Sequence, residues 1–503
     1  MRILYVDVDS LRADHLGCYG YHRNTSPTID EVATQGVRFE NCYCSDAPCL
    51  PSRAALFSGR FGIHTGVVDH LGTAADHFVE GPSRGFRSTL GMTNWMRCLR
   101  NQGFRTVTVS SYAERHSIFN WLAGFSEVHS VDLRSVERAP DISSIALDWI
   151  RRHGREDNWF LHVNFWDLHW PYRTPAEFDN PFEAVPIPAW LTEDIRQQHW
   201  HGCGIQSAQD MFDFHIRFDD YPGMPRQASS MADVRTLFDG YDTSLRYVDM
   251  HIGYLLDALD ETGVLDETAV IISADHGENL GELNIYAGHR LGDLPSTRLP
   301  LIVRWPGITH PGGGRVDRAL HYHVDLAATV LEMVGGAVPG NWDGQSFAEG
   351  LCGGKECHRD YLVISAGAGA LTRSVRFDNY LLIRVYHDGY HCLPDRLLFH
   401  VENDPHEEHD LAPERPDLVG RAMTLLDEWY GEMMRTATHP QDNMWVSLRE
   451  GGPQDTRGWL PQYLERLRQT GRSDWAARLA AKHCRELGAS DGPPLMRHGY
   501  VKI

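Results

Sequence analysis

Short apolar runs that alternate with helical patterns constrain the fold of this chain more than any other feature. The run ILYVDV at residues 3–8 is apolar and ends in acids, which is typical of a buried strand that delivers Asp9 to its carboxyl end. Further strands are predicted at residues 105–110, 159–165, 268–274 and 299–303. Helices are predicted at residues 27–35, 88–101, 142–152, 234–262 and 324–334. The alternation predicts an α/β fold with a large, mostly parallel sheet sandwiched by helices, in which functional residues gather beyond the carboxyl ends of the strands.

The pattern changes after about residue 355. The strand-like runs YLVIS, SVRF, YLLIRVY and RLLFHV precede one helix near residues 417–435, which predicts a smaller antiparallel sheet with a packing helix. Two helical stretches follow, WLPQYLERLRQ and WAARLAAKHCRELG. Because 503 residues exceed one compact core, we predict a catalytic domain at 1–354 with an irregular insertion at about 178–230, an α+β subdomain at 355–440, and a helical extension at 441–503. The extension is expected to cover the site or to mediate formation of a homo-oligomer.

The charge of the chain limits its partners. The formal net charge is −21, from 47 Lys and Arg against 68 Asp and Glu. An acidic chain is a poor candidate for binding nucleic acid or an anionic membrane, so an anionic substrate requires a locally positive pocket. The only lysines are Lys355, Lys482 and Lys502, so nearly all the fixed positive charge is arginine. This scarcity limits which side chains can bind an anion.

Neither a secretion signal nor a membrane anchor is predicted. The first residues, MRILYVDVDSLRAD, carry acids where a signal peptide has its hydrophobic core. No run of 18 apolar residues occurs. Ten cysteines are too few for a disulfide scaffold in a chain of this length. We therefore expect a cytoplasmic protein with free thiols.

The segment CLPSRAALFSGR at residues 49–60 carries the strongest chemical signal. Pro51 and Ser52 are typical of a helix start, so Cys49 is predicted at a helix N-terminus, where the dipole favours negative charge. Arg53 follows one turn later on the same side. A cysteine in this setting is either a low-pKa thiolate or a modified residue, whereas a lone cysteine elsewhere is usually structural.

This segment resembles the C-x-P-S-R signature of the sulfatase family, a branch of the alkaline phosphatase superfamily in which the cysteine is oxidised to formylglycine. Six further segments resemble the family in the same order: LYVDVDSLRADHLGCYG, SPTIDEVATQGVRFENCY, FLHVNFWDLHWPY, the segment ending in ISADHGENLGE, STRLPLIVRWPG and LLFHVENDPHEEHDLA. The C-x-P-S-R and DHGE segments are the specific ones. The resemblance implies hydrolysis of a small-molecule or saccharide sulfate ester, and a formylglycine-generating enzyme as the maturation partner.

The resemblance also implies a metal site. Asp9, Asp275, His276 and the modified Cys49 would bind one divalent cation, either Ca²⁺ or its neighbours Mg²⁺ and Mn²⁺. The two aspartates follow predicted strands and can converge, although an aspartate after a strand also caps turns. Many relatives carry a second acid in the first loop, where this chain has Ser10. Asp7 lies on the same strand face as Asp9 and is a lesser candidate.

Four histidines are candidates for contact with the substrate. His169, in DLHWPY, matches a family histidine that protonates the leaving oxygen or binds the anion. His289 stands where many sulfatases have a lysine that touches the sulfate. A second family lysine is missing from SSYAERHSIF, where Arg115 or His116 would replace it. His70, in GVVDH, is a further candidate, and His70, His116 and His289 also fit solvated or structural roles.

The implied reaction is attack on sulfur by one hydroxyl of hydrated formylglycine, followed by release of sulfate as the aldehyde reforms. An alternative is a phosphonate monoester or phosphodiester hydrolase of the same superfamily, because the first loop D-x-x-R-A-D resembles theirs as well. A second alternative, from another class, is an inactive relative that binds ligands. The presence of the residues needed for catalysis argues against it: these are Asp9, Cys49, Arg53, Asp275 and His276.

Overall fold

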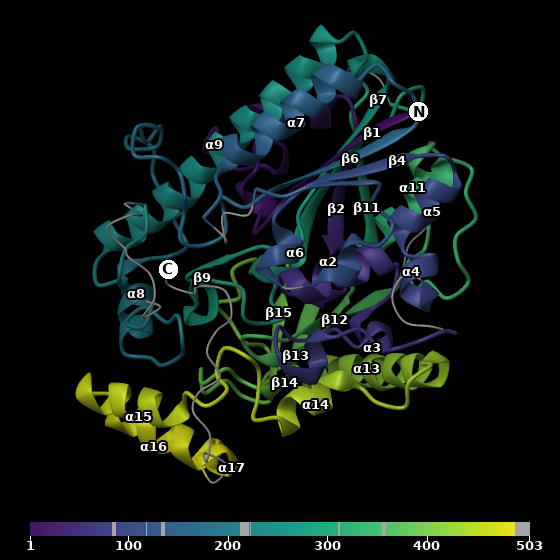
Figure 1. Cartoon of the computed structure of the whole chain (residues 1–503). Coiled ribbons are helices and arrows are strands. Elements are labelled where there is room, and N and C mark those ends of the chain that lie inside the picture. Colours follow the sequence, from purple (N-terminus) through teal and green to yellow (C-terminus); the bar gives the residue numbers. More distant parts are fainter. Residues whose placement is uncertain are drawn as a thin grey trace.

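The centre of the molecule is an eight-stranded sheet (Figure 1). The computed structural model describes the chain except for residues 83–86, 117, 132–135, 212–220, 222, 310–311, 355–358 and 488–503. In the strand order β11-β2-β10-β7-β1-β6-β4-β5, only β10 runs antiparallel to its neighbours, so the predicted, mostly parallel sheet is confirmed. The strands are β1 (Arg2–Val8), β2 (Val37–Tyr43), β4 (Arg105–Val109), β5 (Glu127–His129), β6 (Trp159–Phe165), β7 (Thr268–Ser273), β10 (Arg298–Arg304) and β11 (Arg315–Tyr322).

Helices cover both faces of this sheet. The helices that precede the second sheet are α1 (Pro27–Thr34), α2 (Cys49–Ser58), α3 (Gly62–Thr65), α4 (Thr89–Thr93), α5 (Trp95–Asn101), α6 (Tyr112–Arg115), α7 (Ala139–His153), α8 (Glu193–Trp200), α9 (Met231–Glu261), α10 (Leu294–Thr297), α11 (Asp325–Met333) and α12 (Ala348–Leu351). Side chains of β1 alternate between two cores, because successive strand residues point to opposite faces. Leu4 and Val6 pack with α7 and α9, and Ile3 and Tyr5 pack with α2, α5 and α11. Asp7 therefore points to the face that α2 covers.

The predicted helix at 88–101 is wrong in one respect, because it is two helices. α4 ends before Asn94 and α5 begins after it. The Asn94 side chain accepts a hydrogen bond of 2.9 Å from the backbone N–H of Arg97, which caps α5 and breaks the run. The other predicted helices of this region form within a few residues of their expected bounds.

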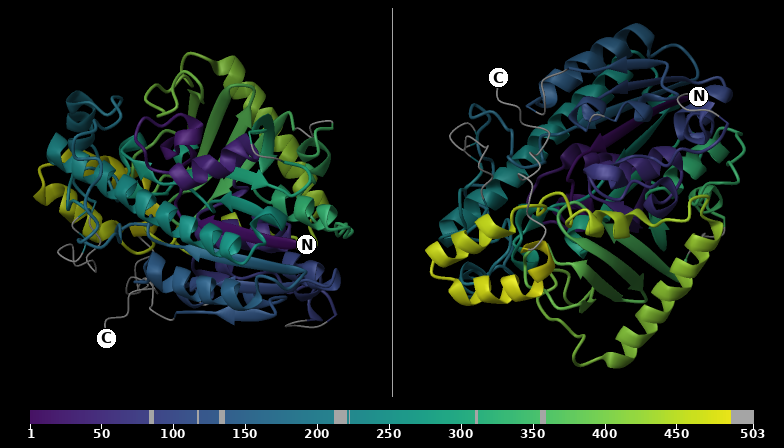
Figure 2. Two further views of the ribbon diagram at one scale, coloured as in Figure 1. Left: turned by 90° about the horizontal axis from the view of Figure 1, so that it is seen from above. Right: turned by 60° about the horizontal axis from the view of Figure 1, so that its bottom comes forward.

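A second sheet holds the C-terminal part of the chain (Figure 2). Four strands are antiparallel, as predicted, and α13 (Pro416–Thr436) packs against two of them. They are β12 (Tyr361–Ala366), β13 (Leu371–Phe377), β14 (Tyr380–His387) and β15 (Arg396–His400). The two-residue strand β3 (Asp46–Ala47), which the sequence did not predict, pairs in parallel with β12. The residues just before Cys49 are thus part of the second sheet.

The chain beyond residue 440 is helical, as predicted, up to the last described residue, Leu487. It contains α14 (Asn443–Arg449), α15 (Leu460–Gln469), α16 (Ser473–Lys482) and α17 (Cys484–Leu487). α15 and α16 share a hydrophobic cluster with Cys203 of the predicted insertion, and Arg466 and Arg472 pair with its Asp210. Within that insertion α8 is regular, and residues 212–220 and 222 lie outside the described residues. No helix among the described residues is both long and apolar enough to cross a membrane.

The packing of α9 against α1 gives a test of the fold. The Asp249 carboxylate on α9 accepts hydrogen bonds from the backbone N–H groups of Thr28 (3.0 Å) and Ile29 (2.9 Å) in the first turn of α1. Asp249→Ala leaves these two donors without a partner, and we expect a loss of about 1–3 kcal/mol in unfolding free energy, measured by urea denaturation. Asp257→Ala, at an exposed position of the same helix, is the control. Equal midpoints for the two variants would contradict this role.

Candidate active site

The carboxyl ends of four neighbouring strands bring the predicted residues together. Asp9 follows β1, and Asp275 and His276 follow β7, which pairs with β1. His116 follows β4 and the short helix α6, and His169 follows β6. His276 Nε2 lies 3.6 Å from Asp9 Oδ1 and 3.4 Å from Asp275 Oδ2, and all three side chains are fully buried. Convergence of these strand ends, expected from the sequence, is what the parallel sheet produces.

One guanidinium stands among three carboxylates in this region. Arg53 Nε lies 2.8 Å from Asp7 Oδ2, and its Nη1 lies 2.9 Å from Asp9 Oδ2 and 2.7 Å from Asp275 Oδ2. Burial acts to raise the pKa of Asp9, but the charge of Arg53 outweighs it and holds that pKa well below its usual range. Burial raises the pKa of Asp275 well above its usual value despite Arg53, and the nearby Asp9 carboxylate adds to the effect. The cluster therefore carries an excess of buried negative charge.

The side chains of this cluster offer ligand atoms that suit a divalent cation. His276 Nδ1 donates to the Gly277 carbonyl (2.8 Å), so its Nε2 presents a lone pair. His276 Nε2 forms no hydrogen bond to any residue that the structure describes, and Asp275 Oδ2 is held by its ion pair with Arg53 Nη1 (2.7 Å). Ligand atoms of Cys49, Asp275 and His276 lie within 4.8 Å of one another. Two carboxylates and one imidazole with an available lone pair are a suitable donor set for Ca²⁺, Mg²⁺ or Mn²⁺.

The contacts of Ser10 show how the loop after β1 is held. Its hydroxyl donates to Asp9 Oδ1 (3.1 Å), and its backbone N–H points to Asp275 Oδ1 (3.4 Å). Its backbone has a positive φ of 61°, which few residues other than glycine adopt. Ser10 thus orients both carboxylates.

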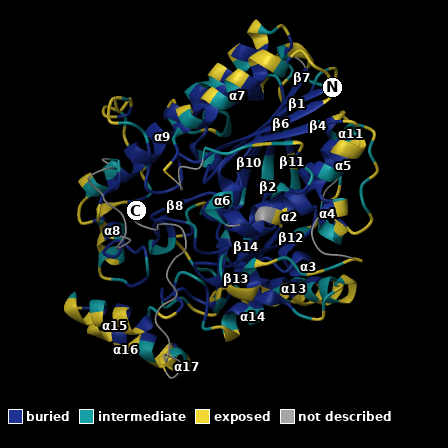
Figure 3. Cartoon of the chain, viewed as in Figure 1, coloured by how far each residue is buried: buried dark blue, intermediate teal, exposed yellow. Residues whose placement is uncertain are grey.

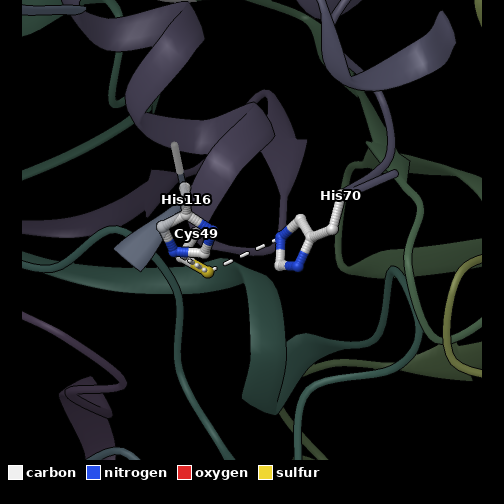
Figure 4. A group of neighbouring side chains, drawn as sticks. All are labelled: Cys49, His70 and His116. Atoms are coloured by element: carbon white, nitrogen blue, oxygen red, sulfur yellow. Dashed lines mark hydrogen bonds between the residues drawn. The ribbon is translucent and has the colours of Figure 1, made fainter. Parts of the chain in front are cut away.

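Cys49 is the first residue of α2 and is 2% exposed. Its Sγ lies 3.5 Å from His70 Nε2 and 3.4 Å from His116 Nε2, so two imidazole rings flank the thiol (Figure 4). The backbone N–H of Leu50 donates to His70 Nε2, which therefore carries a lone pair. Burial raises the pKa of the Cys49 thiol well above its usual value, and Asp9 and Asp275 add to the shift. Of the two functional interpretations of Cys49, the raised pKa disfavours the low-pKa thiolate.

His169 and His289 form the other side of the site. The ring of His289 lies 4.1 Å from that of His276 and 5.0 Å from that of His169, between centroids. His169 Nδ1 donates to the Trp170 carbonyl (2.7 Å), and burial lowers the pKa of His169 well below its usual value. In the neutral ring Nε2 is therefore an acceptor, and His169 has to gain a proton before it can donate one.

The sequence patterns gave little or no indication of several residues that the structure places in the site. The hairpin of β8 (Asn279–Leu280) and β9 (Tyr286–Gly288) places Glu278 beside His289, with Glu278 Oε2 3.1 Å from Nδ1. Glu278 is the last residue of the DHGE motif, and this motif is the sequence feature that could have identified it as a site residue. Asp7, a lesser candidate, binds Arg53 directly. Tyr112, which no pattern predicted, lies under Arg53 at 4.9 Å from its guanidinium.

The scarcity of lysine extends to the site. Arg115, a candidate for a missing lysine, pairs with Glu137 (2.6 Å) and lies 3.9 Å from Asp9 Oδ2. Of the three lysines the structure describes Lys482, which pairs with Asp388 (2.6 Å). The structure brings all nine predicted site residues into one group, which consists of Asp9, Cys49, Arg53, His70, His116, His169, Asp275, His276 and His289.

Comparison with known proteins fixes the family. The Sulfatase family profile matches residues 2–337, and the profile for the C-terminal region of N-sulphoglucosamine sulphohydrolase matches residues 281–419. The chain belongs to the sulfatase family. It is a sulfuric ester hydrolase of the alkaline phosphatase superfamily, as predicted, and sulfatases are generally metal-dependent enzymes with a cysteine-derived formylglycine.

Three relatives illustrate the range around this sulfatase. The ulvan-active sulfatase of Formosa agariphila is 23% identical over 490 residues, covering 91% of this chain and 84% of that protein. A protein solved with its substrate D-glucosamine-2-N,6-O-disulfate has a TM-score of 0.67 and 19% identity, covering 86% of this chain and 98% of that one. The phosphonate monoester hydrolase of Silicibacter pomeroyi has a TM-score of 0.64 and 21% identity, covering 87% and 96%. At identities of 19% and 21%, the likeness to these two solved structures shows a shared fold.

The charge balance around Arg53 predicts a large effect on stability. Arg53→Met leaves three buried carboxylates without their guanidinium, and we expect the unfolding free energy to fall by about 3–5 kcal/mol in chelator-treated protein. Denaturant titration measures the loss. Arg421→Met, which removes an exposed pair with Asp378, is the control and should cost at most about 1 kcal/mol. A loss as small for Arg53 as for Arg421 would contradict this electrostatic role.

Proposed function

We propose that this sulfatase hydrolyses a saccharide sulfate ester to an alcohol and inorganic sulfate, using a formylglycine formed from Cys49 and one bound divalent cation. The observation that carries the proposal is the position of Cys49 Sγ, between two histidine nitrogens and beside the ligand atoms of Asp275 and His276. The raised pKa of the thiol argues against catalysis by unmodified cysteine. A formylglycine-generating enzyme is then the maturation partner.

Asp9, Asp275 and His276 would hold the cation together with an oxygen of residue 49. The carboxylates favour Ca²⁺, with Mg²⁺ and Mn²⁺ as alternatives. When bound, the cation would polarise the sulfuryl oxygens and lower the pKa of the hydroxyl at residue 49. Arg53 keeps the Asp9 carboxylate ionised and holds both Asp9 and Asp275 in place, through contacts of 2.9 and 2.7 Å.

Formylglycine as its hydrate would supply two hydroxyls on one carbon, one to attack sulfur and one to allow release of sulfate. His70 and His116 flank this position, and their Nε2 atoms are within reach of the oxygens of residue 49 and of the sulfuryl group. We assign them to substrate binding. A serine or cysteine at residue 49 has one such group and would remain esterified.

The leaving alcohol is assigned to the side of His169 and His289. The bond between sulfur and the alcohol oxygen breaks, and that oxygen takes one proton. His169 is the proposed donor, since Trp170 holds its Nδ1 and leaves Nε2 as the transferring atom. Because neutral His169 carries no proton on Nε2, that atom would first take up the proton lost by the hydroxyl of residue 49 and then give it to the leaving oxygen, so that the protons balance. Glu278 Oε2 lies 3.1 Å from His289 Nδ1 and orients the ring, whose other nitrogen would bind a sulfuryl oxygen.

A second candidate is hydrolysis of phosphonate monoesters or phosphodiesters. Histidine at position 289, where many sulfatases have lysine, favours it, as does the D-x-x-R-A-D loop. An inactive relative is disfavoured by the fit of Asp9, Asp275 and His276 to a cation. We further propose that residues 1–354 perform the chemistry and that 355–440 and 441–503 support and border the site.

A substrate comparison tests the proposed function. The protein is co-expressed with a formylglycine-generating enzyme, conversion of Cys49 is checked by peptide mass, and turnover of 4-nitrophenyl sulfate and of a phenyl phosphonate monoester is measured. We expect the sulfate ester to be the faster substrate, and both activities to disappear in Cys49→Ala. Faster phosphonate turnover would favour the second candidate. Unchanged activity in Cys49→Ala would refute the nucleophile.

Binding of the cation can be tested without measuring enzymatic activity. After chelation, addition of Ca²⁺ at about 100 times its dissociation constant should stabilise the protein by about 2.7 kcal/mol, seen as a higher thermal midpoint. Mg²⁺ and Mn²⁺ are compared in parallel. Asp275→Asn should abolish the shift, and Asp474→Asn, on exposed α16, should retain it. A midpoint that no ion changes would argue against this metal site.

A further inference from the structure

The C-terminal extension reaches the loop that carries His70. Ser447 Oγ donates to Asp69, the backbone N–H of Gln454 lies 3.3 Å from Asp69 Oδ1, and Arg457 pairs with Asp69 Oδ2 at 3.5 Å. Asp69 is fully buried and immediately precedes His70. Residues beyond 440 therefore hold one wall of the site, in addition to packing α15 and α16 on the insertion.

The same segment brings a carboxylate beside the site. The backbone N–H of Asp455 donates to the Ala368 carbonyl (2.9 Å), in a loop whose Gly367 N–H donates to Ala47, two residues before Cys49. Asp455 Oδ2 lies 3.3 Å from Arg290 Nη1, and Arg290 directly follows His289. The charge of Asp455 also acts on His70, where it opposes the effect of burial, which lowers the pKa of His70 to about 4. Asp455 is thus tied through Arg290 to the segment of His289, and its neighbour Gln454 contacts Asp69 in the segment of His70.

Exposure separates Asp455 from the other acids of this region. The side chains of Asp9, Asp275 and Glu278 are fully buried, whereas that of Asp455 is 24% exposed. Arg290 anchors Asp455 from one side and is itself 2% exposed. A partly exposed, anchored carboxylate accepts hydrogen bonds from hydroxyl groups and repels a second anion.

We propose that Asp455 is a specificity-determining residue that recognises the alcohol part of the ester, and that it selects hydroxyl-rich, singly sulfated sugars. This inference rests on the proposed sulfatase function and adds the class of alcohol. Asp455 binds the sugar hydroxyls next to the sulfate ester and excludes a second sulfate group at that position. The site is therefore completed by a residue about 400 positions from the nucleophile.

The test compares two kinds of ester on one matured enzyme. Steady-state kinetics are measured for a panel of monosaccharide monosulfates and for 4-nitrophenyl sulfate, which has no hydroxyl donor. For Asp455→Ala we expect the ratio of sugar kcat/KM to aryl kcat/KM to fall at least tenfold, mainly through KM. Asp455→Asn keeps an acceptor for the sugar and for Arg290, and should recover part of the ratio. Asp474→Ala, an exposed acid of the same extension, should leave it unchanged.

The other outcomes overturn the inference. An equal fall for sugar and aryl esters would assign Asp455 a purely structural role through Arg290. An unchanged ratio, or a wild-type enzyme that hydrolyses the aryl ester but no sugar of the panel, would also refute it. A wild-type enzyme with confirmed formylglycine but no turnover of the aryl ester or of any sugar would instead refute the proposed function itself.

Discussion

The single guanidinium of Arg53 holds the centre of this molecule together. It joins Asp7 of the first strand and Asp9, just after that strand, with Asp275, just after the neighbouring strand, and it does so from the helix that begins at Cys49. Three carboxylates around one buried guanidinium are stable only if one of them is protonated or further positive charge is available. The contacts that place α2 on the sheet therefore also create a site with excess negative charge, which a divalent cation would balance.

The burial of α2 explains why its position is so fixed. Every residue of Cys49–Ser58 is buried (Figure 3), because the sheet and α11 lie against it while β3 ties its start to the second sheet. Arg53 in the middle of such a helix is tolerated because carboxylates meet it. The helix start is thus set by two sheets at once, so the atom at the end of Cys49 has little freedom relative to Asp9 and Asp275.

Much of this arrangement could be predicted because it depends on local pattern. Apolar runs ending in acids located Asp9 and Asp275, and the proline–serine start located Cys49 at a helix terminus. The edge strands β5 and β11 lack a continuous apolar run and were missed. β3 has two residues and no strand pattern, and the break at Asn94 depends on one side-chain cap. Glu278 and Asp455 reach the site through a hairpin and a distant extension, so their roles depend on tertiary contacts that periodicity does not encode.

The lysine-poor composition has a consequence at the site. Arg53 and Arg115 are already paired with carboxylates. Burial lowers the pKa of His70 to about 4, and that of His116 well below its usual value, so both rings are neutral in the free protein. Neutral imidazoles supply hydrogen bonds but no net charge. Under the proposed function, the positive charge that an arriving sulfate meets would come chiefly from the bound cation. Attraction of the anion and compensation of the carboxylates would then depend on the same ion.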